Sequence, residues 1–179
     1  MFDKFSINKY KSYKYSAPGS IKELKEVMKV NAVPLDNNYA NRYDNIYDVF
    51  ERILKKRNVE FPGELVYFLI KESASIIKKI KDYHNRLRPH QAALNLGISI
   101  KYNNMESAKT PSFPSGHAAQ SQLIAQVLSD KYPRYTSEFM QEAKHIGNSR
   151  LVAHVHYQSD IDVGIKLGND LYKHYLNNA

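Results

Sequence analysis

Three short blocks of the sequence concentrate residue types that can bind and transfer anionic groups. Residues 81–89 read KDYHNRLRP, residues 114–117 read PSGH, and residues 149–160 read SRLVAHVHYQSD. Each block alone has an ordinary explanation, such as a solvated helix face, a serine helix cap or a surface His–Asp pair. Together they supply lysine and arginine cations, a helix start and histidines, which is the inventory for transferring a tetrahedral oxyanion without a metal.

The first block contains a pair of cations at helical spacing. Lys81 and Arg88 are seven residues apart. Because seven residues make about two helical turns, we expect both side chains on one side of a helix that stops before Pro89. The proline then lets the arginine bend back toward the lysine. Two cations placed in this way can hold one dianion.

The second block predicts an anion site at the start of a helix. Gly116 lets the backbone approach a ligand closely, and we expect Ser115 and Gly116 to leave free N–H groups there. The helix dipole favours a negative charge at the same position. His117 is then placed beside the bound anion, where it can pass a proton.

The third block predicts an imidazole backed by a carboxylate. His156 and Asp160 are four residues apart, so on a helix they meet on one face. The carboxylate fixes the tautomer and leaves the other ring nitrogen as base or nucleophile. Arg150 adds a bidentate phosphate donor. His154 lies two residues from His156 and points away from it on a helix, so we expect no shared metal ion.

The rest of the pattern predicts an all-α, single-domain helical bundle. We expect residues 1–60 to form an N-terminal helical segment of unknown role, and residues 61–179 to form the catalytic core. Gly164 and Gly168 lie one helical turn apart and predict close packing between two helices. Helices are expected over residues 20–30, 41–57, from 65 to before 89, 116–130, 137–152 and 160–177, with residues 90–114 largely irregular.

Composition limits the partners. The chain of 179 residues has a net charge of +8 and no cysteine, which excludes disulfides and thiolate zinc sites and favours an anionic partner. No apolar run approaches the roughly 20 residues of a membrane span, and the N-terminus lacks the apolar core of a secretory signal. We therefore expect a cytoplasmic protein. Nucleic-acid recognition signatures are missing from the sequence, whereas its 14 tyrosines could bury a homo-oligomer face.

In order, the patterns K-x6-R-P, P-S-G-H and S-R-x5-H-x3-D resemble the signature of the type 2 phosphatidic acid phosphatase (PAP2) superfamily. That superfamily also contains bacterial class A acid phosphatases and vanadium haloperoxidases. The resemblance implies an all-α fold and a metal-independent phosphatase for phosphomonoesters, with pyrophosphates as an open alternative. A phosphorylated, water-soluble small molecule is the expected substrate. No cofactor is implied, and vanadate is expected to bind as a phosphate mimic.

The resemblance also implies a role for each matched residue. His156 would be the nucleophile that forms a phosphohistidine, and Asp160 would orient it. His117 would protonate the leaving alcohol and later activate water. The phosphoryl oxygens would be held by Lys81, Arg88, Ser115, Gly116 and Arg150.

Two other hypotheses stay open from the residues alone. A vanadium-dependent haloperoxidase would hold vanadate with the same side chains, although the family's haloperoxidases are much larger than this chain. A non-enzymatic basic helical module would bind nucleic acid or other anions through its positive charge. The full set of catalytic residue types argues against the second hypothesis.

Overall fold

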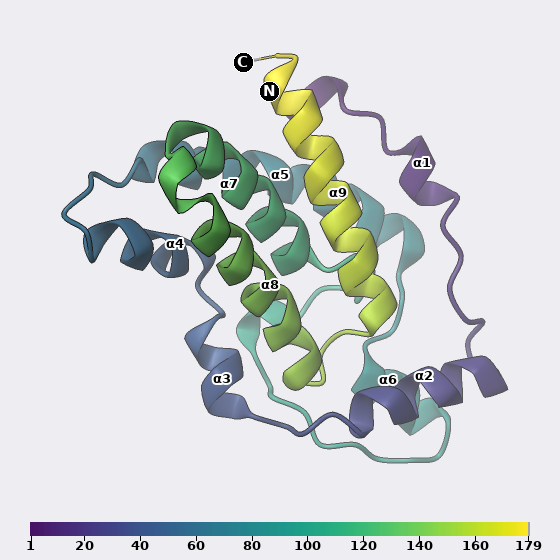
Figure 1. Ribbon diagram of the computed structural model, residues 1–179. Helices are drawn as coiled ribbons and strands as arrows, with labels where there is room; N and C mark the ends of the chain where they lie inside the picture. The colour runs from purple at the N-terminus through teal and green to yellow at the C-terminus, as the bar shows by residue number, and fades with distance from the viewer. Residues whose placement is uncertain (179) are drawn as a thin grey trace.

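The computed structural model describes residues 1–178, which form helices and connecting turns without a strand (Figure 1). The all-α prediction is confirmed. None of the helices in this range is both long and apolar enough to cross a bilayer. The α-helices are α1 Asn8–Lys11, α2 Ile21–Asn31, α3 Asn37–Arg42, α4 Ile46–Lys55, α5 Gly63–His84, α6 Pro89–Asn95, α7 Gly116–Lys131, α8 Thr136–Val152 and α9 Gln158–Leu176. Short 3-10 turns are η1 Phe2–Lys4, η2 Glu106–Ala108 and η3 Pro133–Tyr135.

Helix α7 is the centre of the bundle, because it packs against α8, α9 and α5 (Figure 1). Its approach to α9 is close, and the reason is the pair of glycines predicted to pack. A Cβ atom on Gly164 would lie 2.5 Å from the carbonyl oxygen of Ser115, and one on Gly168 would lie 2.5 Å from that of Ala119. The glycines lie in the second and third turns of α9, and at the start of that helix Ser115 N, at the N-cap of α7, donates to the Asp160 carbonyl at 2.9 Å.

The core lies between α4, α5, α7, α8 and α9, each of which buries an apolar stripe. Removing these side chains from water is the main force that holds the bundle together. It also fixes the helix ends that carry the chemical residues. Fully buried members include Phe50, Leu54, Leu69, Leu123, Ile124, Phe139, Ile146 and Leu167.

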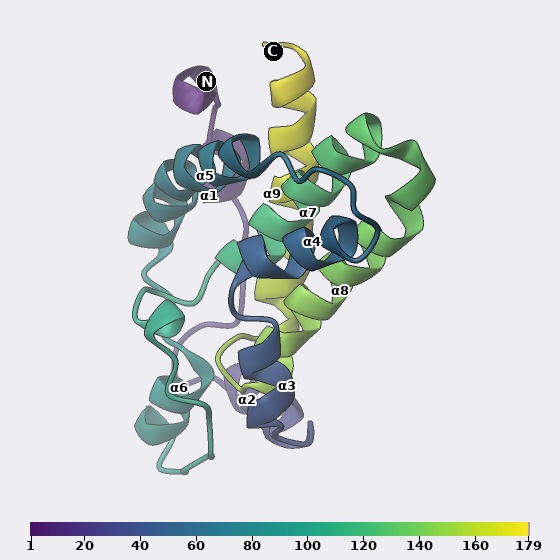
Figure 2. The same cartoon turned by 90° about the vertical axis from the view of Figure 1, so that its left-hand side faces the viewer.

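The N-terminal segment wraps around this core and does not form a separate layer. Helix α1 lies on α5, α2 packs against α6, and α3 and α4 pack against α8 (Figure 2). Side chains of the N-terminal segment contact residues near the ends of α5, α7, α8 and α9. Asp44, in the turn between α3 and α4, is one such contact.

Two helix predictions were wrong in their boundaries. Residues 41–57 are not one helix, because the Asn45 side chain accepts the N–H of Asp48 and so caps the start of α4. The long helix α5 ends at His84, where Asn85 adopts the left-handed conformation with φ of 45°. Pro89 then starts the short helix α6 inside the stretch expected to be irregular, since proline suits the first helical position.

Candidate active site

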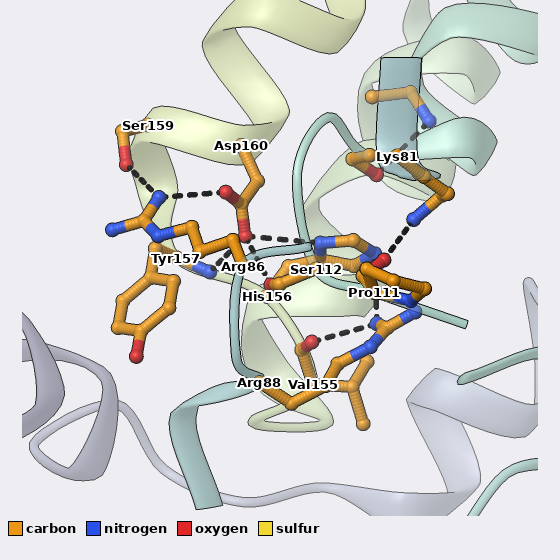
Figure 3. Close-up of polar contacts among 12 residues, drawn as sticks. Lys81, Arg86, Arg88, Pro111, Ser112, Val155, His156, Tyr157, Ser159 and Asp160 are labelled. Carbon is orange, nitrogen blue, oxygen red and sulfur yellow. Dashed lines mark hydrogen bonds and ion pairs between the residues drawn. The ribbon is translucent and has the colours of Figure 1, made fainter. Parts of the chain in front are cut away.

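The first and third chemical blocks meet where helix ends converge (Figure 3). The second block joins them through the hydrogen bond from Ser115 N to the Asp160 carbonyl. Lys81 lies in the last turn of α5, Arg88 caps α6, and Arg150 lies in the last turn of α8. Ser115 caps α7, with Gly116 and His117 in its first turn. His156 and Asp160 stand just before and just inside α9. Six of these side chains are buried, namely Lys81, Arg88, Ser115, Arg150, His156 and Asp160.

His156 is held in one tautomer. Arg88 Nη1 lies 3.0 Å from His156 Nε2, and a guanidinium can only donate, so Nε2 presents a lone pair. The ring proton is therefore on Nδ1, which faces Asp160 Oδ2 at 3.2 Å. Burial and the charge of Arg88 lower the pKa of His156 well below its usual value. The neutral imidazole therefore keeps the Nε2 lone pair available on the side of Arg88.

The contact between His156 and Asp160 does not arise in the way we expected. Helix α9 begins at Gln158, so the two residues do not share a helix face. The Asp160 carboxylate instead turns back toward the helix start, where Oδ2 accepts the N–H of Tyr157 at 3.0 Å. This capping bond places the carboxylate beside the imidazole that precedes the helix.

Asp160 stays ionised although it is fully buried. Burial by itself would raise the pKa of its carboxyl, but the hydrogen bond with His156 and the charge of Arg86 outweigh burial and hold the pKa well below its usual range. Arg86 Nη1 donates to Oδ1 at 2.7 Å, and Ser112 Oγ donates to Oδ2 at 2.5 Å. The ionised carboxylate can therefore accept a hydrogen bond from the Nδ1–H group of His156 in a fixed direction.

Arg86 is a functional residue that the sequence analysis missed. Its guanidinium is sandwiched between the rings of Tyr15 and Tyr157, at 4.4 and 3.9 Å from their centroids. Nη2 donates to Glu26 at 2.9 Å, opposite the bond to Asp160. Arg86 occupies one of the unspecified positions of K-x6-R-P, so no spacing or residue-type signal marked it.

The cations predicted to hold phosphate converge, but not by the expected route. Arg88 is not on the helix of Lys81, because α5 ends at His84 and the chain returns Arg88 to the site through a loop. All three cations donate to the segment at residues 107–111. Lys81 Nζ donates to the Pro111 carbonyl, Arg88 Nε to the Thr110 carbonyl at 2.8 Å, and Arg150 Nη2 to Ser107 Oγ at 3.0 Å.

The electrostatics of these cations favour an anion. Burial and the neighbouring charge of Arg88 lower the pKa of Lys81 to about 7, and burial lowers the pKa of Arg88 to about 10. Burial also lowers the pKa of Arg150. A dianion placed among them would relieve both the desolvation and the mutual repulsion. Arg150 Nε is buried without a hydrogen-bond partner among residues 1–178, so it can donate to such a ligand.

The start of α7 offers fewer free amides than expected. The Ser115 N–H is taken by the Asp160 carbonyl, and Ser115 Oγ accepts the N–H of Ala118 at 3.4 Å. Gly116 N–H makes no hydrogen bond within the described chain and remains available to an anion. The hydroxyl proton of Ser115 can also be donated, since its cap bond uses only the oxygen lone pair.

His117 contacts Asp44 of the N-terminal segment. Its Nε2 lies 2.8 Å from the Asp44 carbonyl oxygen and 3.2 Å from Asp44 Oδ1. Burial and the charge of Arg150 lower the pKa of His117. His154, by contrast, places its ring nitrogens 2.7 Å from the carbonyls of Lys101 and Val33 and takes no part in the site. Among residues 1–178, no group of three or more metal-ligating side chains is placed to hold a metal ion.

Comparison with known proteins identifies a family whose matched range contains the three blocks. The family model of the PAP2 superfamily matches residues 64–169, more than half of the chain. The chain belongs to the PAP2 superfamily. Among curated PAP2 relatives, the non-specific acid phosphatase of Salmonella typhi is 35% identical over 88 residues, and that of Providencia stuartii is 29% identical over 85 residues. The first alignment covers 49% of this chain and 35% of the Salmonella protein, so the chain matches about a third of that relative's length.

Solved structures show the same PAP2 fold. A bacterial vanadium-dependent iodoperoxidase superposes with a TM-score of 0.66 and 20% identity, over 98% of this chain and 54% of that one. A transmembrane PAP2-type phosphatidylglycerolphosphate phosphatase from Bacillus subtilis gives a TM-score of 0.55 and 17% identity, over 87% and 83% of the two chains. At these identities the likeness concerns the fold.

The PAP2 match spans the three motif blocks and leaves two carboxylate residues of the site outside its range. Glu26 and Asp44 both precede the matched range, yet one binds Arg86 and the other binds His117 and Arg150. The N-terminal segment therefore takes part in the site of this PAP2 protein.

Proposed function

We propose that this PAP2 protein hydrolyses phosphomonoesters of small water-soluble molecules through a phosphohistidine, without a metal ion. One observation carries the proposal: His156 presents the lone pair of Nε2 beside Arg88, while Asp160 holds the opposite side of the ring. A histidine arranged in this way is an activated nucleophile facing an anion-binding group. The homology to acid phosphatases supports the same reaction.

In the first step, the phosphoryl oxygens bind the buried cations and the free N–H of Gly116. Nε2 of His156 attacks phosphorus, an N–P bond forms, and the P–O bond to the alcohol breaks with its electron pair moving to oxygen. His117 donates a proton to that oxygen. Charge that develops on the phosphoryl oxygens is stabilised by side chains already in place, which takes the part that a metal ion plays elsewhere.

In the second step, water attacks the phosphohistidine and gives its proton to His117. The N–P bond breaks, its electron pair returns to Nε2, and inorganic phosphate leaves. Asp160 stabilises the imidazole during both steps because its carboxylate remains ionised. Both histidines then hold the protons with which they began.

A cavity of about 430 Å³ is lined by Arg88 and Val155 but not by His156 or His117, so we infer that it would hold the part of a small hydrophilic substrate beyond the phosphoryl group. Its lining includes the amides of Gln91 and Asn104 and the ammonium of Lys109, and within residues 1–178 it contains no acidic side chain. Such a lining suits phosphorylated and hydroxylated molecules. A pyrophosphate presents the same terminal group, so a substrate panel decides between the two classes.

The test is hydrolysis of p-nitrophenyl phosphate between about pH 5 and 8 in the presence of EDTA. We expect turnover that vanadate inhibits and that falls by about 10³-fold or more in His156→Ala, because the nucleophile is lost. His174→Ala, in the last turn of α9 and far from the site, is the matched control and should retain activity. A radiolabelled phosphoenzyme trapped in alkali should appear only when His156 is present.

Other results would replace the proposal. Equal activity in the wild type and His156→Ala would remove His156 as nucleophile. Bromide oxidation with added vanadate and peroxide, without phosphatase activity, would favour a haloperoxidase. Nucleic-acid binding that collapses with salt and ignores His156→Ala would favour a binding module.

A further inference from the structure

Asp44 is a charged residue in the site that the family match does not include. It lies in the turn between α3 and α4, and the PAP2 match begins at residue 64. Its Oδ1 accepts from Arg150 Nη1 at 2.8 Å and from Ser107 Oγ at 2.6 Å, and it lies 3.2 Å from His117 Nε2. Three donors thus converge on one carboxylate oxygen whose side chain is 33% exposed.

The contacts of Asp44 determine which nitrogen of His117 is free. The Asp44 carbonyl oxygen and Oδ1 can only accept, so His117 Nε2 must carry a proton. Nδ1 has no hydrogen-bond partner among residues 1–178. When the ring is protonated, Nδ1 is therefore the nitrogen that can give its proton to a substrate.

We propose that Asp44 is a positioning residue that holds His117 with Nδ1 toward the leaving-group oxygen and fixes Arg150 at the phosphoryl site. The inference rests on the proposed phosphatase function. It assigns to the N-terminal segment the task of orienting the proton donor. Asp160 performs the corresponding task for the nucleophile His156.

The geometry favours positioning over a carboxylate that merely occupies the anion site. Asp44 binds Nε2 of His117 and leaves Nδ1 free. It also leaves Arg150 Nε without a partner, although that atom is buried. A carboxylate that stood in for the phosphoryl group would be expected to satisfy these donors, and Asp44 satisfies neither.

The charge of Asp44 also acts on proton transfer. Two charged groups face His117: Asp44, from the turn before α4, and Arg150, from α8. Burial and Arg150 lower the pKa of His117, whereas the hydrogen bonds and charge of Asp44 raise it. Removing the carboxylate charge should therefore lower this pKa further and reduce the protonated fraction available as an acid.

The test compares wild type, Asp44→Asn and the matched control Asp48→Asn, whose side chain is exposed on α4. Two substrates are used: p-nitrophenyl phosphate, whose leaving group needs little protonation, and glycerol 2-phosphate, whose alkoxide needs a proton. General acid catalysis is worth about 10² to 10⁴-fold. We expect the kcat of Asp44→Asn to fall by about 10²-fold or more with glycerol 2-phosphate. With the aryl substrate, the factor by which kcat falls should be about ten times smaller. The basic limb of its kcat profile should move to lower pH.

An NMR titration of the His117 ring gives a second readout that needs no turnover. The pKa of His117 should fall in Asp44→Asn and stay unchanged in Asp48→Asn. Equal loss with both substrates, a gain in kcat, or an unchanged His117 pKa in a folded Asp44→Asn protein would overturn the inference. A wild type without phosphatase activity whose His117 pKa still responds to Asp44 would defeat the proposed function and leave the contact between Asp44 and His117 established.

Discussion

Replacing Arg86 with methionine should remove a large part of the stability of this protein. The Arg86 side chain is 2% exposed and donates to two carboxylates, Asp160 at 2.7 Å and Glu26 at 2.9 Å. Methionine fills much of the same space between the flanking aromatic rings but leaves Asp160 charged and without its arginine. Breaking a buried ion pair by removing one partner costs about 3–5 kcal/mol. A domain of this kind is stable by about 5–15 kcal/mol, so the variant should still fold.

Urea unfolding followed by circular dichroism measures this cost. With a slope of about 1–3 kcal/mol per molar urea, the midpoint should fall by about 1–5 M. Arg57→Met is the matched control, because Arg57 pairs with Glu138 at the surface and is 33% exposed. An exposed pair contributes about 0–1 kcal/mol, so its midpoint should hardly move.

The pH dependence of the same measurement checks the cause. Asp160 has a lowered pKa in the folded protein, so its ionised form adds stability above the unfolded pKa of about 3.9, and that stability is lost as pH falls. Without Arg86 the lowering should be smaller. The difference between wild type and Arg86→Met should therefore be largest near neutral pH and shrink in acid. A midpoint shift no larger than that of Arg57→Met would refute the reasoning.

Two further predictions concern the phosphate site and the packing beneath it. Because burial and Arg88 lower the pKa of Lys81 to about 7, Lys81 loses its positive charge above that pH, and kcat/KM should fall as pH rises through about 7. Steady-state rates of Lys81→Arg should show this limb at higher pH, and an unchanged limb would contradict the assignment. Gly168→Ala should cost about 1–3 kcal/mol in thermal unfolding, because its Cβ would lie 2.5 Å from the Ala119 carbonyl oxygen. Gly147→Ala, with no atom nearer than 3.5 Å, should be neutral or stabilising, and equal effects would contradict this packing argument.

The sequence predicted the helical fold and the later helices well because their signals are local. Ser115 before Gly116 marks a helix start, and α7, α8 and α9 begin and end within two residues of the expected positions. The α5 end was harder to predict. Asn85 stops the helix through a backbone conformation that asparagine tolerates but does not require, so the helical pattern continued past the true end.

The missed site residues act through contacts that are distant in sequence. Arg86 and Glu26 are 60 residues apart, and Arg150 and Asp44 are 106 apart. Only the packing of the N-terminal segment on α6 and α8 brings these pairs together. The hydrophobic period of one sequence indicates which face of a helix is apolar. It does not indicate which turn of another segment packs against that face.

The charges of the site divide into two groups with different tasks. Arg86 is matched by Asp160 and Glu26, and Arg150 is matched by Asp44. Within residues 1–178, Lys81 and Arg88 form no ion pair.

Instead, Lys81 and Arg88 donate to backbone carbonyls, and Arg88 also donates to His156. A phosphate monoester carries about −1.5 to −2 charges near neutral pH, which these two cations can balance. In the proposed reaction, Arg86 is therefore part of the structural frame, and Asp44 holds Arg150 with its Nε free for a phosphoryl oxygen. Lys81 and Arg88 supply the unmatched charge that would attract the dianion to Nε2. For the same reason, a bound dianion should raise the pKa of Lys81, so affinity for inorganic phosphate should weaken as pH rises above about 7.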